Sequence, residues 1–135
     1  MKIFLDTNVL VAAFASRGLC GDLFRVVLAE HDLLVGDVVL IELRRILKQK
    51  IKLPPSHVDD LVSFLRHHTV IPKPKKHLSL ALGDPDDEWV VASAVVGGAD
   101  MLVTGDALLL AIKSPPLPIV SPRGLWEQLS KSGNG

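Results

Sequence analysis

Two acidic residues directly follow predicted strands, where a side chain can take part in chemistry. Asp6 follows the apolar run Ile3–Leu5, and Asp106 follows the run Met101–Thr104 after one glycine. Each short apolar run predicts a buried strand. In open α/β sheets, ligands bind beyond the carboxyl ends of parallel strands. Both aspartates are therefore candidates for a functional site, although aspartate at such a position also commonly caps the next helix.

Glu42 is a third acid in an unusual place, within the apolar stripe of the predicted helix Val38–Lys50. It lies one turn after Val38 and one turn before Ile46. A glutamate on a buried face costs several kcal/mol unless it pairs with a base or binds a metal ion. The bases of this helix are predicted on its opposite side, and they are Arg44, Arg45 and Lys48.

Asp87 lies in an acidic cluster at the start of the predicted helix Pro85–Val96. It precedes Val90 and Val91 by three and four residues, so it lies in line with the apolar face of that helix. Helix capping and the macrodipole offer a purely structural explanation. That explanation suits the neighbouring acids better than Asp87, and those neighbours are Asp84, Asp86 and Glu88.

The pattern of apolar residues predicts strands that alternate with helices. The strands are expected at Ile3–Leu5, Leu33–Val35, Thr69–Ile71, Met101–Thr104 and Pro118–Val120. The helices are expected at Thr7–Phe14, Leu19–Ala29, Val38–Lys50, Pro55–Arg66, Pro85–Val96, Ala107–Ile112 and Gly124–Leu129. Such alternation predicts an α/β fold, a three-layer α/β/α sandwich with a central, mainly parallel five-stranded sheet.

The length of 135 residues predicts one domain, expected over 1–129, with 130–135 as a flexible tail. The 15 bases and 15 acids balance, so nucleic-acid binding would depend on local basic patches. The single cysteine, Cys20, excludes an intramolecular disulfide and a cysteine zinc site. We expect no signal peptide and no membrane span, and hence a cytoplasmic protein.

The acids together suggest metal chemistry. Four carboxylates in one cleft would repel one another and raise one another's pKa. A divalent cation relieves that repulsion, and all-oxygen ligands suit Mg²⁺ or Mn²⁺. Paired ions of this kind activate water and stabilise the leaving oxygen in phosphodiester cleavage. Thr7, Asn8 and Thr104 would donate hydrogen bonds to phosphate or to the acids, unless they serve only in caps and turns.

The order of these acids along the chain resembles that of the PIN-domain nucleases. That family carries an aspartate after the first strand, a glutamate on a helix, an aspartate opening a later helix and an aspartate after the fourth strand. The matching stretches are Leu5–Leu10, Ile41–Leu43, Asp86–Trp89 and Val103–Asp106. The stretches Ser16–Gly18, Gly97–Asp106 and Ile119–Pro122 look like the subgroup of VapC-like toxins. The resemblance covers nearly the whole chain.

The resemblance implies a metal-dependent endoribonuclease. Mg²⁺ or Mn²⁺ would be held by Asp6, Glu42, Asp87 and Asp106, and water would attack the phosphorus of an RNA phosphodiester in line. Relatives in this family often act as toxins restrained by a small antitoxin, so such a protein is an expected partner. The high apolar content and neutral charge also suggest a homodimer.

Basic residues near the cleft are candidates for contact with the RNA substrate. On helices and turns these are Arg17, Arg44, Arg45 and Lys48, and in the proline-rich loop they are Lys73, Lys75 and Lys76. A solvated charged surface is the alternative explanation for both groups. Trp89 adjoins the acidic cluster, but a helix core position suits it better than stacking on a base.

Three other functions are compatible with parts of the sequence. A metal-independent ribonuclease would need a histidine pair, and His67 and His68 are adjacent, so they point in different directions on a helix. A phosphoacceptor receiver domain would need paired acids after the first strand, where Asp6 is single. A PIN fold that only binds RNA or protein is the third alternative, and the intact acids argue against it.

Overall fold

The structure is a computed structural model that describes residues 1–76 and 85–133. Within these residues it contains five strands and seven helices. In chain order they are β1 (Lys2–Leu5), α1 (Thr7–Ala15), α2 (Leu19–Glu30), β2 (Asp32–Gly36), α3 (Asp37–Gln49), α4 (Pro55–Arg66), β3 (Thr69–Ile71), α5 (Pro85–Val96), β4 (Met101–Val103), α6 (Ala107–Leu110), β5 (Ile119–Val120) and α7 (Pro122–Gly133).

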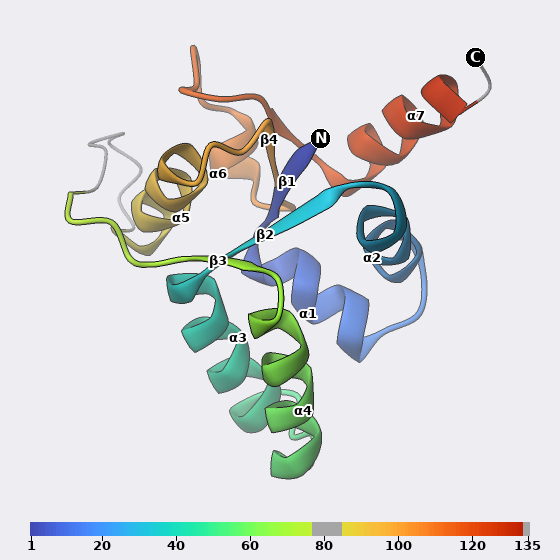
Figure 1. Cartoon of the computed structure of the whole chain (residues 1–135), viewed down its shortest axis with the longest axis vertical. Coiled ribbons are helices and arrows are strands. Elements are labelled where there is room, and N and C mark those ends of the chain that lie inside the picture. The colour runs from blue at the N-terminus through green and yellow to red at the C-terminus, as the bar shows by residue number, and fades with distance from the viewer. Residues whose placement is uncertain (77–84, 134–135) are drawn as a thin grey trace.

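The five strands form one sheet in the order β3-β2-β1-β4-β5, and every neighbouring pair is parallel. β1 lies in the middle, with Ile3 paired to Leu33 of β2 and to Met101 of β4. Helices α5 and α6 lie on one side of the sheet, and α1 and α2 lie on the other (Figure 1). The expected three-layer α/β/α architecture is confirmed, and the sheet is wholly rather than mainly parallel.

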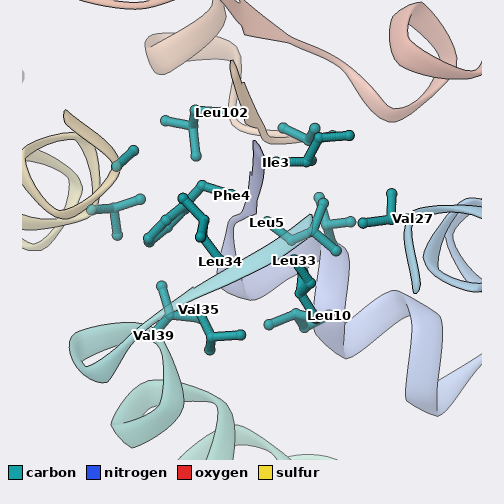
Figure 2. Close-up of a cluster of buried hydrophobic side chains, with 14 of the residues drawn as sticks. Ile3, Phe4, Leu5, Leu10, Val27, Leu33, Leu34, Val35, Val39 and Leu102 are labelled. Carbon is teal, nitrogen blue, oxygen red and sulfur yellow. The ribbon is translucent and has the colours of Figure 1, made fainter. Parts of the chain in front are cut away.

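Alternate residues of β1 fill the two halves of the core. Figure 2 shows Ile3 and Leu5 directed toward the side of α1 and α2, and Phe4 directed toward the side of α5. All three are almost fully buried. A Cβ added at Gly36 would lie 2.7 Å from the Phe4 ring, so the packing of that ring requires glycine where β2 meets α3.

The C-terminal helix differs from the sequence prediction at both ends. α7 begins at Pro122 rather than Gly124, because the Ser121 hydroxyl accepts a hydrogen bond from the Gly124 N–H (3.0 Å) and proline suits the first helical position. The helix continues to Gly133, beyond Leu129, where the sequence predicts its end. Residues 134–135 lie outside the described residues.

Helix α6 is shorter than the sequence predicts. It ends at Leu110, two residues before the predicted end. Asp84, one of the acids near the start of α5, lies outside the described residues. No helix in the described ranges combines the length and the apolar character that crossing a membrane requires.

Candidate active site

One pocket, of about 260 Å³, brings together the four acids that the sequence singles out. It opens beyond the carboxyl ends of the central strands, where the chain leaves β1 and β4 for helices. It is lined by Asp6, Thr7, Asn8, Glu42, Ile46, Asp87, Val90 and Asp106. Carboxylates that are far apart in the sequence thus share one hollow, which we call the acid pocket.

Asp6 is the most deeply buried acid of the pocket, with 6% of its surface exposed. It caps α1, since its Oδ1 accepts a hydrogen bond from the Thr7 N–H at 2.7 Å. Its Oδ2 accepts hydrogen bonds from the Thr104 hydroxyl at 2.7 Å and from the Asn8 side-chain amide at 3.3 Å. Capping and site formation are therefore not alternatives here, because the two oxygens serve different purposes.

Thr104 and Asn8 link the turn after β1 to the turn after β4. The Thr104 hydroxyl accepts a hydrogen bond from the Asp106 N–H at 3.0 Å, in addition to donating one to Asp6. The Asn8 carbonyl oxygen accepts one from the Gly105 N–H at 3.0 Å. Thr104 is fully buried. Both roles that the sequence leaves open are thus observed for these two residues, since each contacts Asp6 and each also holds the backbone of the turn after β4.

Asp106 caps the short helix α6 while it faces the acid pocket. Its Oδ1 accepts a hydrogen bond from the Leu108 N–H at 2.8 Å. The backbone N–H of Asp106 donates a hydrogen bond to the Thr104 hydroxyl, and that hydroxyl donates one to the Asp6 carboxylate. The Asp6 carboxylate and the Asp106 backbone therefore belong to one hydrogen-bonded network, while the Asp106 carboxylate is held separately at the start of α6.

Glu42 lies on a half-buried line of α3 with Val38 and Ile46, as the helical spacing predicts. The Thr7 hydroxyl donates a long hydrogen bond to its Oε2, at 3.4 Å. Across residues 1–76 and 85–133, no arginine or lysine forms an ion pair with Glu42. A buried ion pair therefore does not explain why an acid stands at this position.

The electrostatics of the pocket disfavour ionised carboxylates. Burial raises the pKa of Asp6 and the charge of Asp106 adds to that effect, against hydrogen bonds from Thr104, Thr7 and Asn8 that lower it. Burial also raises the pKa of Glu42, followed by the charges of Asp6 and Asp86, while Arg45 and Thr7 lower it. A cation in the pocket would offset this repulsion.

The acids in the first turn of α5 line two different pockets. Asp87 lines the acid pocket, whereas Asp86 lines a second pocket on the other side of Glu42. Adjacent residues of a helix point about 100° apart, so only one of the two can face the same hollow. The alignment of Asp87 with Val90 and Val91 is the sequence signal that identifies it.

The donor set of the acid pocket consists of oxygen atoms only, which fits Mg²⁺ or Mn²⁺. The side chains are not gathered as a preformed metal cluster, since no group of three acids, histidines or cysteines in the described ranges is close enough to hold an ion. Capping holds one oxygen of Asp6 and one of Asp106. The residues thus fit a divalent cation by their chemistry, with side chains that must draw inward to bind it.

The bases predicted to contact substrate fall in different places. Arg44 pairs with Asp59 of α4, and Arg17 lines a separate hollow between α1 and α2, so neither lines the acid pocket. Arg45, predicted on the far side of α3, instead lines the second pocket beside Glu42. Arg45 follows Glu42 by three residues, close to one helical turn, and this spacing in the sequence indicates that the two side chains are neighbours on the helix surface.

Comparison with known proteins agrees with this description. A chain in the structure of VapBC2 from Rickettsia felis, bound to a DNA fragment from its promoter, matches with a TM-score of 0.67 and 20% identity, over 90% of this chain and 98% of that one. A chain of DNA-bound VapBC from Salmonella typhimurium matches with a TM-score of 0.63 and 17% identity, over the same shares. No curated protein matches in sequence.

The sequence profile of the PIN domain matches residues 2–108. This range runs from β1 into α6 and includes all four acids of the pocket. The solved VapBC chains have the same fold at low sequence identity. The matched sequence and the shared architecture agree, and this chain belongs to the PIN-domain family.

Proposed function

We propose that the protein is a metal-dependent endoribonuclease. The observation that carries the proposal is the acid pocket, to which the turn after β1, α3, α5 and the turn after β4 each contribute one carboxylate. Asp6, Glu42, Asp87 and Asp106 would hold Mg²⁺ or Mn²⁺. When bound, the cation supplies activation of water and neutralises charge on the phosphate.

The roles of the chain's own residues follow from their contacts. Asp6 is held in place through both carboxylate oxygens. Thr104 and Asn8 are positioning residues, since each joins Asp6 to the turn that carries Asp106. Thr7 connects Asp6 to Glu42 through its N–H and its hydroxyl. These links join the Asp6 carboxylate to Glu42 and to the backbone of the turn that carries Asp106, so the elements that bear three of the four carboxylates are connected before substrate arrives.

The toxin of a toxin–antitoxin pair is the biological role that we propose for this nuclease. Two chains with the same fold, from Rickettsia felis and Salmonella typhimurium, are parts of VapBC assemblies. A small antitoxin is therefore the proposed protein partner, and a homodimer is the proposed oligomeric state. Light scattering of the purified chain, alone and co-expressed with a candidate small antitoxin, tests both.

Cleavage assays test the nuclease proposal directly. Purified protein is incubated with a mixed panel of RNAs and DNAs in Mg²⁺, in Mn²⁺ or in chelator. We expect RNA cleavage that requires a divalent cation and that is lost in Asp106→Asn. Asparagine caps helices as well as aspartate does, so this variant keeps the fold. Cleavage in chelator would overturn the metal requirement, and RNA binding without cleavage would instead favour the scaffold function.

A further inference from the structure

A second pocket adjoins the acid pocket and shares Glu42 and Val90 with it. Its volume is about 300 Å³, at the lower end of the range typical of small-ligand sites. It lies between α3, α5 and the segment after β3, and it is lined by Val38, Ile41, Glu42, Arg45, Lys73, Asp86, Trp89 and Val90. A molecule that reaches from one pocket into the other passes Glu42.

The walls of the second pocket combine apolar and cationic groups. Ile41 is 63% exposed although it belongs to an otherwise well-packed helix, so the fold does not require its apolar side chain. Trp89 is half-buried, and the Lys73 ammonium group lies 4.4 Å from the centre of its ring. Arg45 supplies a guanidinium group beside Glu42. Apolar surface next to cations is the combination that binds nucleotides in single strands.

We propose that the second pocket binds an unpaired nucleotide of the RNA strand, next to the phosphate that lies in the acid pocket. The inference rests on the nuclease function proposed above. The base packs against Trp89 and Ile41, and the phosphate of that nucleotide is bound by Arg45 and Lys73. Asp86 adds a carboxylate, a group that accepts hydrogen bonds from base amino groups.

The charge distribution favours RNA over a protein partner as the occupant. A strand of nucleic acid needs cations wherever its phosphates lie, and all the charged side chains that line the acid pocket are carboxylates. Arg45 and Lys73 place two cations directly beside that pocket. A base enters a hollow of this kind only when it is unstacked, so the pocket favours single-stranded over duplex RNA.

The contact between Lys73 and Trp89 allows RNA binding to be followed by tryptophan fluorescence. Phosphate binding draws the ammonium group toward the ligand, and stacking of a base changes the surroundings of the indole. Both events change the emission of Trp89. The chain contains two tryptophans, so Trp126→Phe leaves Trp89 as the single reporter. This background variant is titrated in chelator, which prevents cleavage, with single-stranded RNA, with the same RNA as a duplex and with DNA of the same sequence.

The expected result is a saturable change in Trp89 emission with single-stranded RNA and a much weaker one with duplex. Lys73→Ala and Arg45→Ala in the same background should each weaken binding roughly tenfold, as the loss of one charge-assisted contact does. The matched controls are Lys50→Ala, at the end of the helix that carries Arg45, and Lys113→Ala, both exposed lysines outside the pocket. The controls should change binding by no more than about twofold.

The remaining outcomes separate this inference from the nuclease proposal. If RNA that the wild type cleaves leaves Trp89 emission unchanged, or if the control variants weaken binding equally, the inference is overturned. A response of Trp89 to protein concentration or to an antitoxin, but not to RNA, overturns it in favour of a protein interface. If the wild type cuts nothing while Trp89 still responds to RNA through Lys73, the pocket is supported as an RNA site and the nuclease proposal falls.

Discussion

Titratable side chains gather at both ends of the strands, here called the carboxyl edge and the amino edge of the sheet, but the two ends hold them differently. At the carboxyl edge, Asp6 and Asp106 are joined through Thr104, whose hydroxyl reaches Asp6 across 98 positions of sequence. At the amino edge, a pocket of about 290 Å³ is lined by His31, Asp32, Leu33, His67, His68 and Thr69. The carboxyl edge joins distant segments, so its geometry depends on the whole fold.

The histidines of the amino edge bond mostly to backbone close by. The Nδ1–H of His67 donates to the Ser63 carbonyl at 2.7 Å, and that of His68 donates to the Phe64 carbonyl at 3.2 Å, both within α4 or at its end. His31 lies 3.2 Å from the N-terminal amino group. A cluster of titratable residues is therefore not sufficient evidence for an active site, since bonds within α4 or at its end account for the positions of His67 and His68.

Helix direction explains why acids gather at one edge. Helices α1, α3 and α6 begin where β1, β2 and β4 end, so their N-termini face the carboxyl edge. The positive end of the helix macrodipole favours negative groups there. Capping accounts for the presence of Asp6 and Asp106, and the links through Thr104 and Asn8 turn two caps into one site.

The largest expected effect distinguishes the two edges by activity. Asp106→Asn should lower the rate of RNA cleavage by more than about a hundredfold, the upper effect of losing a residue that only supports a metal ligand. His68→Ala, at the amino edge, should leave the rate unchanged. Initial rates in Mn²⁺ measure both. Equal losses in the two variants would mean that the edges do not differ as we describe.

Removal of the Thr104 hydroxyl tests the link itself. Thr104→Val keeps the shape of this fully buried side chain but leaves Asp6 Oδ2 and the Asp106 N–H without that partner. We expect a loss of about 1–3 kcal/mol in the free energy of unfolding and a tenfold to hundredfold lower cleavage rate, roughly. Thr104→Ser retains the hydroxyl and should restore most of both. Denaturant unfolding and initial cleavage rates measure the two effects. If Thr104→Ser restores neither, the losses in Thr104→Val come from altered packing and not from the missing hydroxyl.

Glu42→Gln tests the repulsion in the acid pocket through pH. The pKa of Glu42 is raised by burial first, then by Asp6 and Asp86. Ionisation of Glu42 therefore lowers stability, fully so above its folded-state pKa and not at all below its ordinary value of about 4.5. In chelator, the variant should melt higher than the wild type at neutral pH, and the difference should shrink as pH falls.

With Mg²⁺ present, the stability advantage expected for Glu42→Gln in chelator should shrink or reverse. Mg²⁺ should raise the melting temperature of the wild type more than that of Glu42→Gln, because a ligand that binds only the folded state stabilises it. A thermal melt series at several Mg²⁺ concentrations measures the difference. Glu42→Gln melting below the wild type at every pH in chelator would argue that the carboxylate is not repelled in the apo protein.

The smallest expected effect concerns a pair remote from both edges. Arg44 and Asp59 join α3 to α4 at a largely exposed position. Arg44→Ala should lower the free energy of unfolding by less than about 1 kcal/mol, as is usual for surface ion pairs. Denaturant unfolding provides the measurement. A larger loss would show that this contact, rather than the buried residues beneath it, orients α3 and hence Glu42.

Local patterns in the sequence were sufficient for most of the architecture. Short apolar runs and helical spacing predicted the strands and helices close to their observed bounds, and the position of Asp6 and Asp106 after strands predicted the end of the sheet at which the acid pocket lies. Those features depend on neighbours along the chain. The end of α7 was predicted less well, because the polar composition of residues 130–133 concealed a helix that begins at a serine cap.

The tertiary structure decided which side chains meet. It brought Arg45 rather than Arg44 beside Glu42, directed Asp87 and Asp86 into different pockets, and turned Thr104 toward Asp6. Each of these outcomes depends on the rotation of a helix about its axis or on contacts between distant turns. A sequence pattern fixes which face of an element is apolar, but only packing against its neighbours fixes where the residues at the border of that face point.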